Sequence, residues 1–209
     1  MAVRPDASQL YHQFMQEISD RLHQVKSLTV TVSQDTKAPT AMYQAELAYL
    51  QVRFICELIA LASLSAHYSL GIQKDLIKLW RADEIFERLE DINPHSFPYP
   101  VKSSRKPDGG LHFDAAPDRA MTRLELKSIY GQCGNSLHRG VLKHALASNR
   151  RVYDLNQVAR WAGRISTLLA EHAILFAKEG KAVFVSMNPE GTGRVLVAHA
   201  EASGPFAVS

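Results

Sequence analysis

The chain has 209 residues, 46% of them hydrophobic and 22% charged, a composition that excludes general disorder and allows one domain with a sizeable core. Its formal net charge of +3 comes from 24 Lys and Arg against 21 Asp and Glu, a mild excess that permits a nucleic-acid partner without requiring one. Its two cysteines, Cys56 and Cys133, exclude a disulfide framework and fit a reducing compartment.

The N-terminal third is predicted to be helical. From Ser8 to about Leu28, apolar residues recur at three- and four-residue steps, which indicates an amphipathic helix capped by Asp6 or Ser8. Residues 28–33 alternate apolar and polar side chains, so they form either a half-buried strand or the end of the same helix. From Thr40 to about Leu70, apolar residues cover most of the circumference, which is typical of a central helix or of one shared with a second subunit.

The middle of the chain combines helices with an irregular segment. Asp75–Leu89 is predicted to be a shorter helix, ended by the prolines that follow it. Residues 94–117 are rich in Pro, Gly and Ser and are predicted to be an irregular insertion, with Leu111–Asp114 as a candidate short strand. A further helix is predicted from Pro117 or Asp118 to about Leu137.

The C-terminal third changes from helix to strand. Residues 140–151 form a basic bridge to a helix predicted over Asp154–Lys178, with Asp154 as its N-cap and Gly180 as its stop. Beyond it, the period of the apolar residues changes to two. Two short strands, Ala182–Met187 and Arg194–Ala198, are therefore predicted to form a β-hairpin.

Together these elements predict a mainly α protein, a helical bundle of about five helices with a C-terminal β-hairpin. The bundle is expected over residues 1–180, including the 94–117 insertion, and the hairpin and tail over residues 181–209, packed on the bundle. A lone hairpin is barely stable. Residues 29–32 or 111–113, or a partner subunit, are therefore expected to complete a small sheet with it.

The stretch Arg123–Gly140, RLELKSIYGQCGNSLHRG, is the main candidate for a functional site. It begins as an amphipathic helix and ends in polar side chains that a plain helix does not need. Gly131 and Gly134 would each cost roughly 1 kcal/mol relative to alanine inside a helix, so they indicate a close backbone approach or a helix end. The polar residues of this stretch include Tyr130, Gln132, Asn135, His138 and Arg139.

These residue types fit acid–base chemistry or ligand binding. Histidine titrates near neutrality, so His138 is a candidate general acid or base, with Arg139 stabilising an anionic transition state. Asn135 or Tyr130 would orient groups, and Gln132 would contribute to binding. The alternative is structural: the glycines let helices pack, Tyr130 and His138 bond to backbone carbonyls, and Asn135 caps the helix.

The order tyrosine, glycine, a few small or polar residues and then histidine, from Tyr130 to His138, resembles the terminal-helix segment of HEPN-type helical bundles. These bundles belong to prokaryotic toxin, abortive-infection and RNA-processing systems. The resemblance implies a dimeric, metal-independent ribonuclease without a cofactor, in which His138 matches the catalytic histidine and Asn135 a polar residue before it. The family places an arginine four to six positions before the histidine, whereas positions 132–134 of this chain hold none.

A polar stripe crosses the predicted central helix, where Glu46, Arg53 and Glu57 are spaced by seven and four residues. If these charges are buried they must pair, because an unpaired buried charge is too costly. Arg53 and Glu57 are therefore expected either to face His138 across the bundle as binding residues, or to form an internal ion pair or a solvent-facing edge.

Neither a metal site nor a membrane segment is expected. The nine histidines show no HExxH spacing, and no CxxC pair occurs. The N-terminus lacks the apolar region of a signal peptide. The most apolar segment, Phe54–Leu64, is too short to span a bilayer and contains Glu57. The sequence therefore predicts a cytoplasmic protein.

Three functions remain consistent with these patterns. The first is a HEPN-like protein that cleaves or binds RNA, with His138 at the site. The second is a non-catalytic homo-oligomeric interaction or regulatory module. The third is a bundle that binds a small molecule or anion in a pocket lined by Tyr130, Asn135 and Glu57. A phosphate backbone would suit the basic residues Lys102, Arg105, Lys106, Arg139, Lys143, Arg150 and Arg151, although solvated loops commonly carry such residues.

Overall fold

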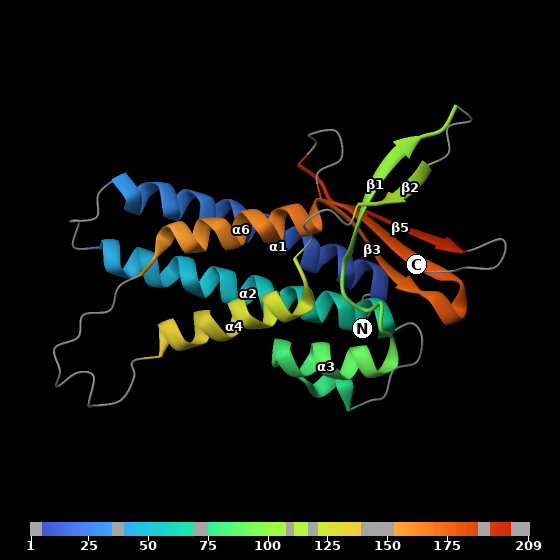
Figure 1. Ribbon diagram of the computed structural model, residues 1–209, viewed down its shortest axis with the longest axis horizontal. Coiled ribbons are helices and arrows are strands. Elements are labelled where there is room, and N and C mark those ends of the chain that lie inside the picture. Colours follow the sequence, from blue (N-terminus) through green and yellow to red (C-terminus); the bar gives the residue numbers. More distant parts are fainter. Residues whose placement is uncertain are drawn as a thin grey trace, which may run out of the picture.

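The computed structural model describes residues 6–34, 40–68, 75–107, 111–116, 121–138, 153–187 and 193–201. Within these ranges the protein is mostly helical, and a helical bundle carries a five-stranded antiparallel sheet at one end (Figure 1). The helices are α1 (Ala7–Gln34), α2 (Ala41–Tyr68), α3 (Ala82–Ile92), α4 (Arg123–Leu137) and α6 (Leu155–Ala170). The strands are β1 (Tyr99–Arg105), β2 (Leu111–Ala115), β3 (Glu171–Phe176), β4 (Lys181–Ser186) and β5 (Leu196–Glu201).

Helix α1 begins at the predicted cap and continues through the segment that could have been a strand. The Asp6 carboxylate accepts a hydrogen bond from the Gln9 N–H at 2.7 Å. Residues 28–33 are helical, so the strand alternative is wrong. The hydroxyls of Thr29 and Thr31 donate to carbonyls of the preceding turn, at 3.0 Å each. These bonds satisfy the polar groups of the β-branched run inside the helix.

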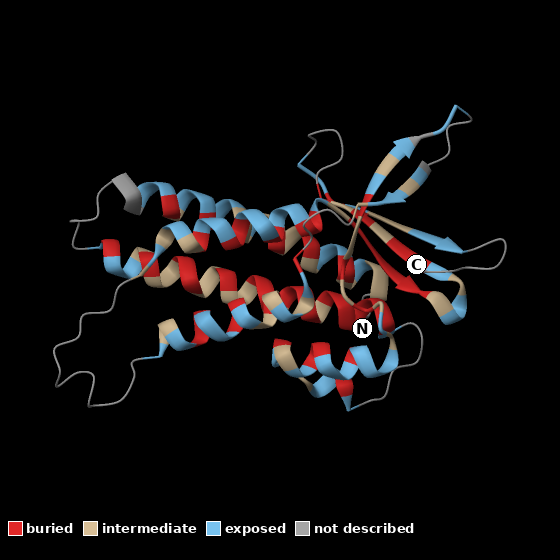
Figure 2. Ribbon diagram, in the orientation of Figure 1, coloured by how far each residue is buried: buried red, intermediate tan, exposed pale blue. Residues whose placement is uncertain are grey.

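Helix α2 is the central helix, as predicted, and 16 of its 28 residues are buried. Figure 2 shows its buried residues lying between the other helices. It is longer than Phe54–Leu64, and by length and composition alone it could cross a bilayer, but 61% of its most apolar window is buried inside the fold. Its apolar surface is therefore largely accounted for by the core.

The predicted helix Asp75–Leu89 is wrong in its first half. A short 3₁₀ turn at Leu76–Lys78 is followed by extended residues, and α3 starts only at Ala82. Leu76 and Ile85 are both fully buried. Nine residues apart, they would point to opposite sides of one helix. The break lets both side chains reach the core.

The predicted helix Asp154–Lys178 is also too long. Its start is confirmed, because the Asp154 side chain accepts from the Gln157 N–H at 2.9 Å. Helix α6 ends at Ala170, however, and the next six residues form β3, whose last five residues are buried. Both faces of this strand are covered, and such an uninterrupted apolar run does not distinguish strand from helix. Gly180, with φ of 61°, ends the short 3₁₀ turn after β3 instead.

The predicted C-terminal hairpin is confirmed and is part of a larger sheet. Strands β4 and β5 pair from Lys181 opposite Glu201 to Ser186 opposite Leu196. The strand order is β2-β1-β3-β4-β5, so the expected strand at 111–113 does belong to this sheet. Residues 94–117 are therefore not an irregular insertion, since they contain β1 and β2. The expected division into a bundle over residues 1–180 and a hairpin over residues 181–209 therefore does not match the sheet, because β1, β2 and β3 precede residue 180 and β4 and β5 follow it.

Candidate functional site

Helix α4 carries the candidate site and is fixed at its first turn. The Thr122 hydroxyl accepts from the Glu125 N–H at 3.2 Å, and the Glu125 carboxylate accepts from the Thr122 N–H at 2.8 Å. This capping box starts the helix at Arg123. The predicted start at Pro117 or Asp118 lies outside the described residues.

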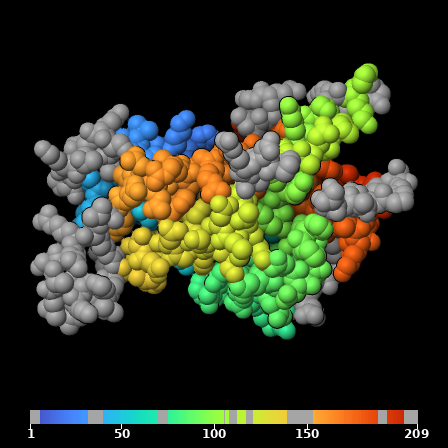
Figure 3. Space-filling model, in the orientation of Figure 1, coloured from blue at the N-terminus to red at the C-terminus, as the bar shows by residue number. Residues whose placement is uncertain are grey.

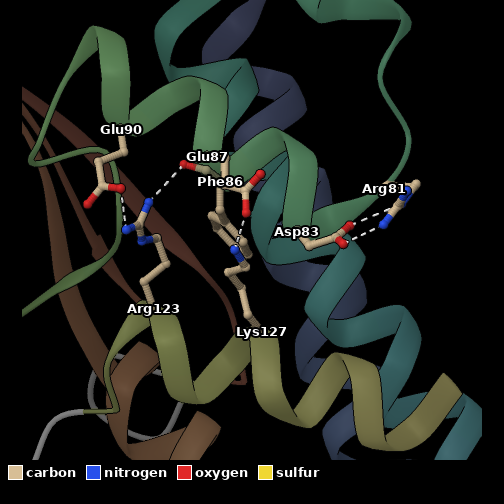
Figure 4. Close-up of polar contacts among 7 residues, drawn as sticks. All are labelled: Arg81, Asp83, Phe86, Glu87, Glu90, Arg123 and Lys127. Carbon is tan, nitrogen blue, oxygen red and sulfur yellow. Dashed lines mark hydrogen bonds and ion pairs between the residues drawn. The ribbon is translucent and has the colours of Figure 1, made fainter. Parts of the chain in front are cut away.

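Three contacts with α3 hold the same end of α4 in place (Figure 4). Arg123 forms an ion pair with Glu90 and donates to the Phe86 carbonyl at 3.2 Å. Lys127 forms an ion pair with Glu87. On its other side α4 lies along α6, with which it shares one surface of the molecule (Figure 3). The helix that leads to His138 is therefore held by α3 and α6 in addition to the central helix α2.

The polar residues predicted for the site fall on two different faces of α4. Tyr130, Cys133 and Gly134 are buried against the bundle. Gln132, Asn135 and His138 are exposed. Tyr130 and Asn135 therefore do not line one common pocket, which the small-molecule hypothesis had expected.

Arg53 of α2 meets the buried face of α4. Its Nη2 donates to the Tyr130 hydroxyl at 2.8 Å, and its Cζ lies 4.2 Å from the centre of the Tyr130 ring. Its Nε lies 3.3 Å from a carboxylate oxygen of Glu57. The Arg53 and Glu57 side chains are 24% and 22% exposed. The predicted ion pair is therefore confirmed, and solvent reaches it.

Gly134 makes room for the Arg53 guanidinium. A Cβ atom at position 134 would lie 2.6 Å from Arg53 Nη1, so any side chain there would displace the guanidinium. Gly131 differs, because a Cβ there would meet no atom within 4 Å. Of the two glycines singled out in the sequence, only Gly134 therefore reflects a close approach.

The charges around Tyr130 favour a neutral phenol. Burial raises the pKa of Tyr130, the Arg53 charge lowers it, and Glu57 raises it again. Beside it, burial raises the pKa of the Cys133 thiol to about 12, and the pKa of Cys56 is likewise well above its usual value because of burial. Both cysteines are therefore thiols at neutral pH and are unsuited to nucleophilic chemistry.

His138 ends α4 one turn beyond Gly134. Its N–H donates to the Gly134 carbonyl at 3.0 Å, and its backbone is extended, with φ of −68° and ψ of 134°. Within the described part of the chain, no hydrogen bond or ion pair joins its side chain to Arg53 or Glu57. Arg139 lies outside the described residues, as does the basic bridge 140–151.

The other predicted binding residues have structural partners. Gln132 donates to the Ser128 hydroxyl at 3.1 Å and accepts from the Gln157 side chain at 3.3 Å, so it links α4 to α6. Glu46, at the far end of the polar stripe, accepts from the Tyr153 hydroxyl at 2.8 Å. Among the described residues, no group of three His, Cys, Asp or Glu side chains could hold a metal ion.

Sequence reasoning missed the contribution of α3 to this site. Arg81 and Asp83, at the first turn of α3, form an ion pair at 2.6 Å and lie close enough to Tyr130 for their charges to act on it. No spacing rule connects residues 81–83 with residue 130, so only the packing of α3 against α2 and α4 reveals them. Comparison of the chain with protein-family models, curated proteins and solved structures finds no match.

Proposed function

We propose that this protein is a HEPN-like, RNA-acting helical protein, and that it cleaves RNA without a metal ion at the C-terminal end of α4. The observation that supports this function is the position of Arg53. Its guanidinium fills the space that a side chain at position 134 would need. Position 134 lies four residues before His138, which is where the resemblance calls for an arginine.

In this proposal Arg53 of α2 takes the place of the arginine that the family motif has shortly before its histidine and that α4 lacks at positions 132–134. A guanidinium carries five N–H donors. Nε of Arg53 serves Glu57, and Nη2 serves Tyr130. Within the described part of the chain, Nη1 has no hydrogen-bond partner, so its two N–H groups remain for a phosphate oxygen. The partial exposure of the side chain gives such a ligand access.

The residues then divide the chemistry of RNA cleavage between them. A general base takes the proton of a ribose 2′-hydroxyl, the 2′-oxygen forms a bond to the adjacent phosphorus, and the bond to the 5′-oxygen breaks as that oxygen receives a proton. His138 serves as the acid or base, because an imidazole has one nitrogen that can donate a proton and one that can accept it. Arg53 stabilises the extra negative charge on the phosphoryl oxygens, and Asn135 orients the substrate.

The charge of the surrounding chain suits a polyanion. Residues 126–153 contain no Asp or Glu and five Lys or Arg, with His138 near their centre. Contacts between such cations and phosphates supply most of the sequence-independent affinity for RNA. The five cations are Lys127, which is paired with Glu87, and Arg139, Lys143, Arg150 and Arg151.

A second candidate function is a non-catalytic homo-oligomeric module. It is favoured by Met42 and Tyr43, which expose apolar surface at the first turn of α2, and by Val30 on α1. Exposed apolar side chains that gather in one region mark association surfaces. A second copy of this chain would be the partner in that case, and no nuclease activity would be needed.

The purified chain incubated with RNA in the presence of EDTA tests the proposal. We expect it to cut single-stranded RNA into products that end in 2′,3′-cyclic phosphates, and to leave DNA of the same sequence intact, because DNA lacks the attacking 2′-hydroxyl. The products are read on a denaturing gel and by mass spectrometry. A protein that leaves RNA whole while it forms concentration-dependent oligomers would favour the second function instead.

A further inference from the structure

Trp80 is unusually exposed for a tryptophan. The chain has only two, and Trp161 is 8% exposed in the core whereas Trp80 is 69% exposed. A tryptophan buries on the order of 150–250 Å² when it packs. An exposed tryptophan gives up that stabilisation. Single exposed leucines are common on protein surfaces, whereas tryptophan is enriched where proteins bind a partner.

The backbone on both sides of Trp80 is held in place. Leu76 before it and Ala82 after it are both 1% exposed, and Leu79 and Arg81, on either side of Trp80, have extended backbones. Arg81, which immediately precedes α3, is tied to Asp83 by an ion pair at 2.6 Å. The indole is thus presented to solvent from a fixed point.

Trp80 lies at the edge of the candidate site. The ion pairs of Arg123 with Glu90 and of Lys127 with Glu87 show that α3 and α4 run in opposite directions, so the first turn of α3 lies toward Tyr130. The Tyr130 hydroxyl accepts a hydrogen bond from Arg53. Figure 4 places Arg81 and Asp83 at the start of α3. His138 follows Tyr130 by eight residues, which is about 12 Å along a helix.

Both cations beside Trp80 have carboxylate partners: Arg81 gives Nε and Nη2 to Asp83, and Lys78 pairs with Asp75. Nη1 of Arg81 and the ammonium of Lys78 are the donors that a phosphate would meet. Lys78 and Arg81 stand on either side of the indole in the sequence and are exposed. The Lys78–Asp75 pair is 3.5 Å apart and almost fully exposed, so it is weak, and Lys78 can turn to another anion. The α3 carboxylates Glu87 and Glu90 are engaged by cations of α4. An aromatic ring between cations is the arrangement by which proteins stack unpaired bases.

We infer that Trp80 is a stacking platform for an unpaired nucleobase, and that the substrate of this site is therefore single-stranded RNA. The inference rests on the proposed RNA function and adds the substrate class to it. A base stacked on Trp80 would leave the adjoining nucleotides free to follow α4 toward His138. Duplex RNA, whose bases are stacked on each other, would not use the ring.

The test uses the full-length His138→Ala protein, so that RNA is bound without being cut. We expect a single-stranded RNA oligonucleotide to quench the tryptophan emission, because Trp80 is exposed and Trp161 is buried. Adding Trp80→Ala should weaken binding of the labelled oligonucleotide at least about tenfold, measured by anisotropy, since one stacked base commonly contributes that much. Trp80→Phe should retain most of the affinity, and Ile77→Ala, which alters a neighbouring exposed side chain, should retain all of it.

Three results would overturn the inference. Unchanged affinity in the Trp80→Ala protein would leave the RNA function standing and remove the stacking platform. Equal affinity for the duplex, with no dependence on Trp80, would do the same. Quenching that follows protein concentration without RNA would make Trp80 part of a self-association surface. If the His138→Ala protein binds no RNA and the unaltered protein cleaves none, the proposed function itself fails, and the inference fails with it.

Discussion

Replacing His138 with alanine is expected to lower the rate of RNA cleavage by at least about a hundredfold, the usual size of a lost general acid or base. The imidazole is the proton-exchanging group that the proposed site places at the end of α4. The comparison requires single-turnover rates for the unaltered and variant proteins on the same single-stranded RNA.

The same substitution should leave the fold intact. The His138 side chain is exposed, and the bond that ends α4 comes from its backbone N–H, which alanine retains. The free energy of unfolding should therefore change by no more than about 0.5 kcal/mol. His112→Ala is the matched control, because His112 is an exposed histidine on β2, in the sheet at one end of the bundle (Figure 1). Equal loss in both variants, or none in either, would remove His138 from the mechanism.

Acid is expected to destabilise the protein through His172, a fully buried histidine of β3. Its Nδ1 lies 3.0 Å from the Leu169 carbonyl, which only accepts, so Nδ1 carries the proton. Its Nε2 then accepts from the Tyr11 hydroxyl at 2.8 Å. A second proton would turn Nε2 into a donor, place a positive charge in the core and require the Tyr11 hydroxyl to rotate from donor to acceptor. Burial accordingly lowers the pKa of His172 to about 4.

The sign of the effect follows from the two protonation states. Between pH 6.5 and pH 4 the unfolded chain binds a proton at this histidine and the folded chain does not, so stability falls as the pH falls. With an unfolded pKa of about 6.5, the contribution of His172 should shrink by about 2 kcal/mol between pH 7.5 and pH 5.0. Burial also lowers the pKa of His67, which acts in the same direction.

Urea unfolding at pH 7.5 and pH 5.0 measures this dependence. The His172→Gln protein keeps hydrogen-bonding capacity without a titrating ring, so it should lose about 2 kcal/mol less than the unaltered protein over this range. Tyr11→Phe is the control that keeps His172: it should be less stable at both pH values and retain the pH dependence. An identical pH dependence in the His172→Gln protein would assign the acid sensitivity to other groups.

The positions of the helices could be predicted wherever apolar residues recur at helical spacing or a capping residue marks the first turn. Helix α2 was predictable because apolar residues surround it, and the starts of α1 and α6 because Asp6 and Asp154 cap them. The end of α6 was not, since the apolar run 173–176 in β3 is buried on both faces and has no strand alternation. Strand β1, YPVKSSR, was hidden by its proline and polar residues.

The composition of the candidate site was predictable in part. The glycines and the polar stripe of α2 pointed to a close approach and to an ion pair, and Gly134 and the Arg53–Glu57 pair provide them. The contact that joins them links Arg53 to Tyr130, 77 residues further along the chain. Helical spacing shows which residues share a face of one helix, but it does not show which helices contact each other. The sequence therefore predicts Arg139 as the stabilising cation and leaves open whether Arg53 faces His138, whereas the structure places Arg53 against Tyr130 and Gly134.

The most direct test of the central claim moves the arginine from α2 to α4. Arg53→Ala should slow RNA cleavage about a hundredfold, the size expected for a lost charge-stabilising donor. Adding Gly134→Arg should restore much of the rate, because the new side chain enters the space that Arg53 vacated. Adding Gly131→Arg instead should restore nothing, because residue 131 is exposed and a Cβ there would meet no atom of a neighbouring element within 4 Å. Full activity in the Arg53→Ala protein, or equal rates in the two double variants, would contradict the account.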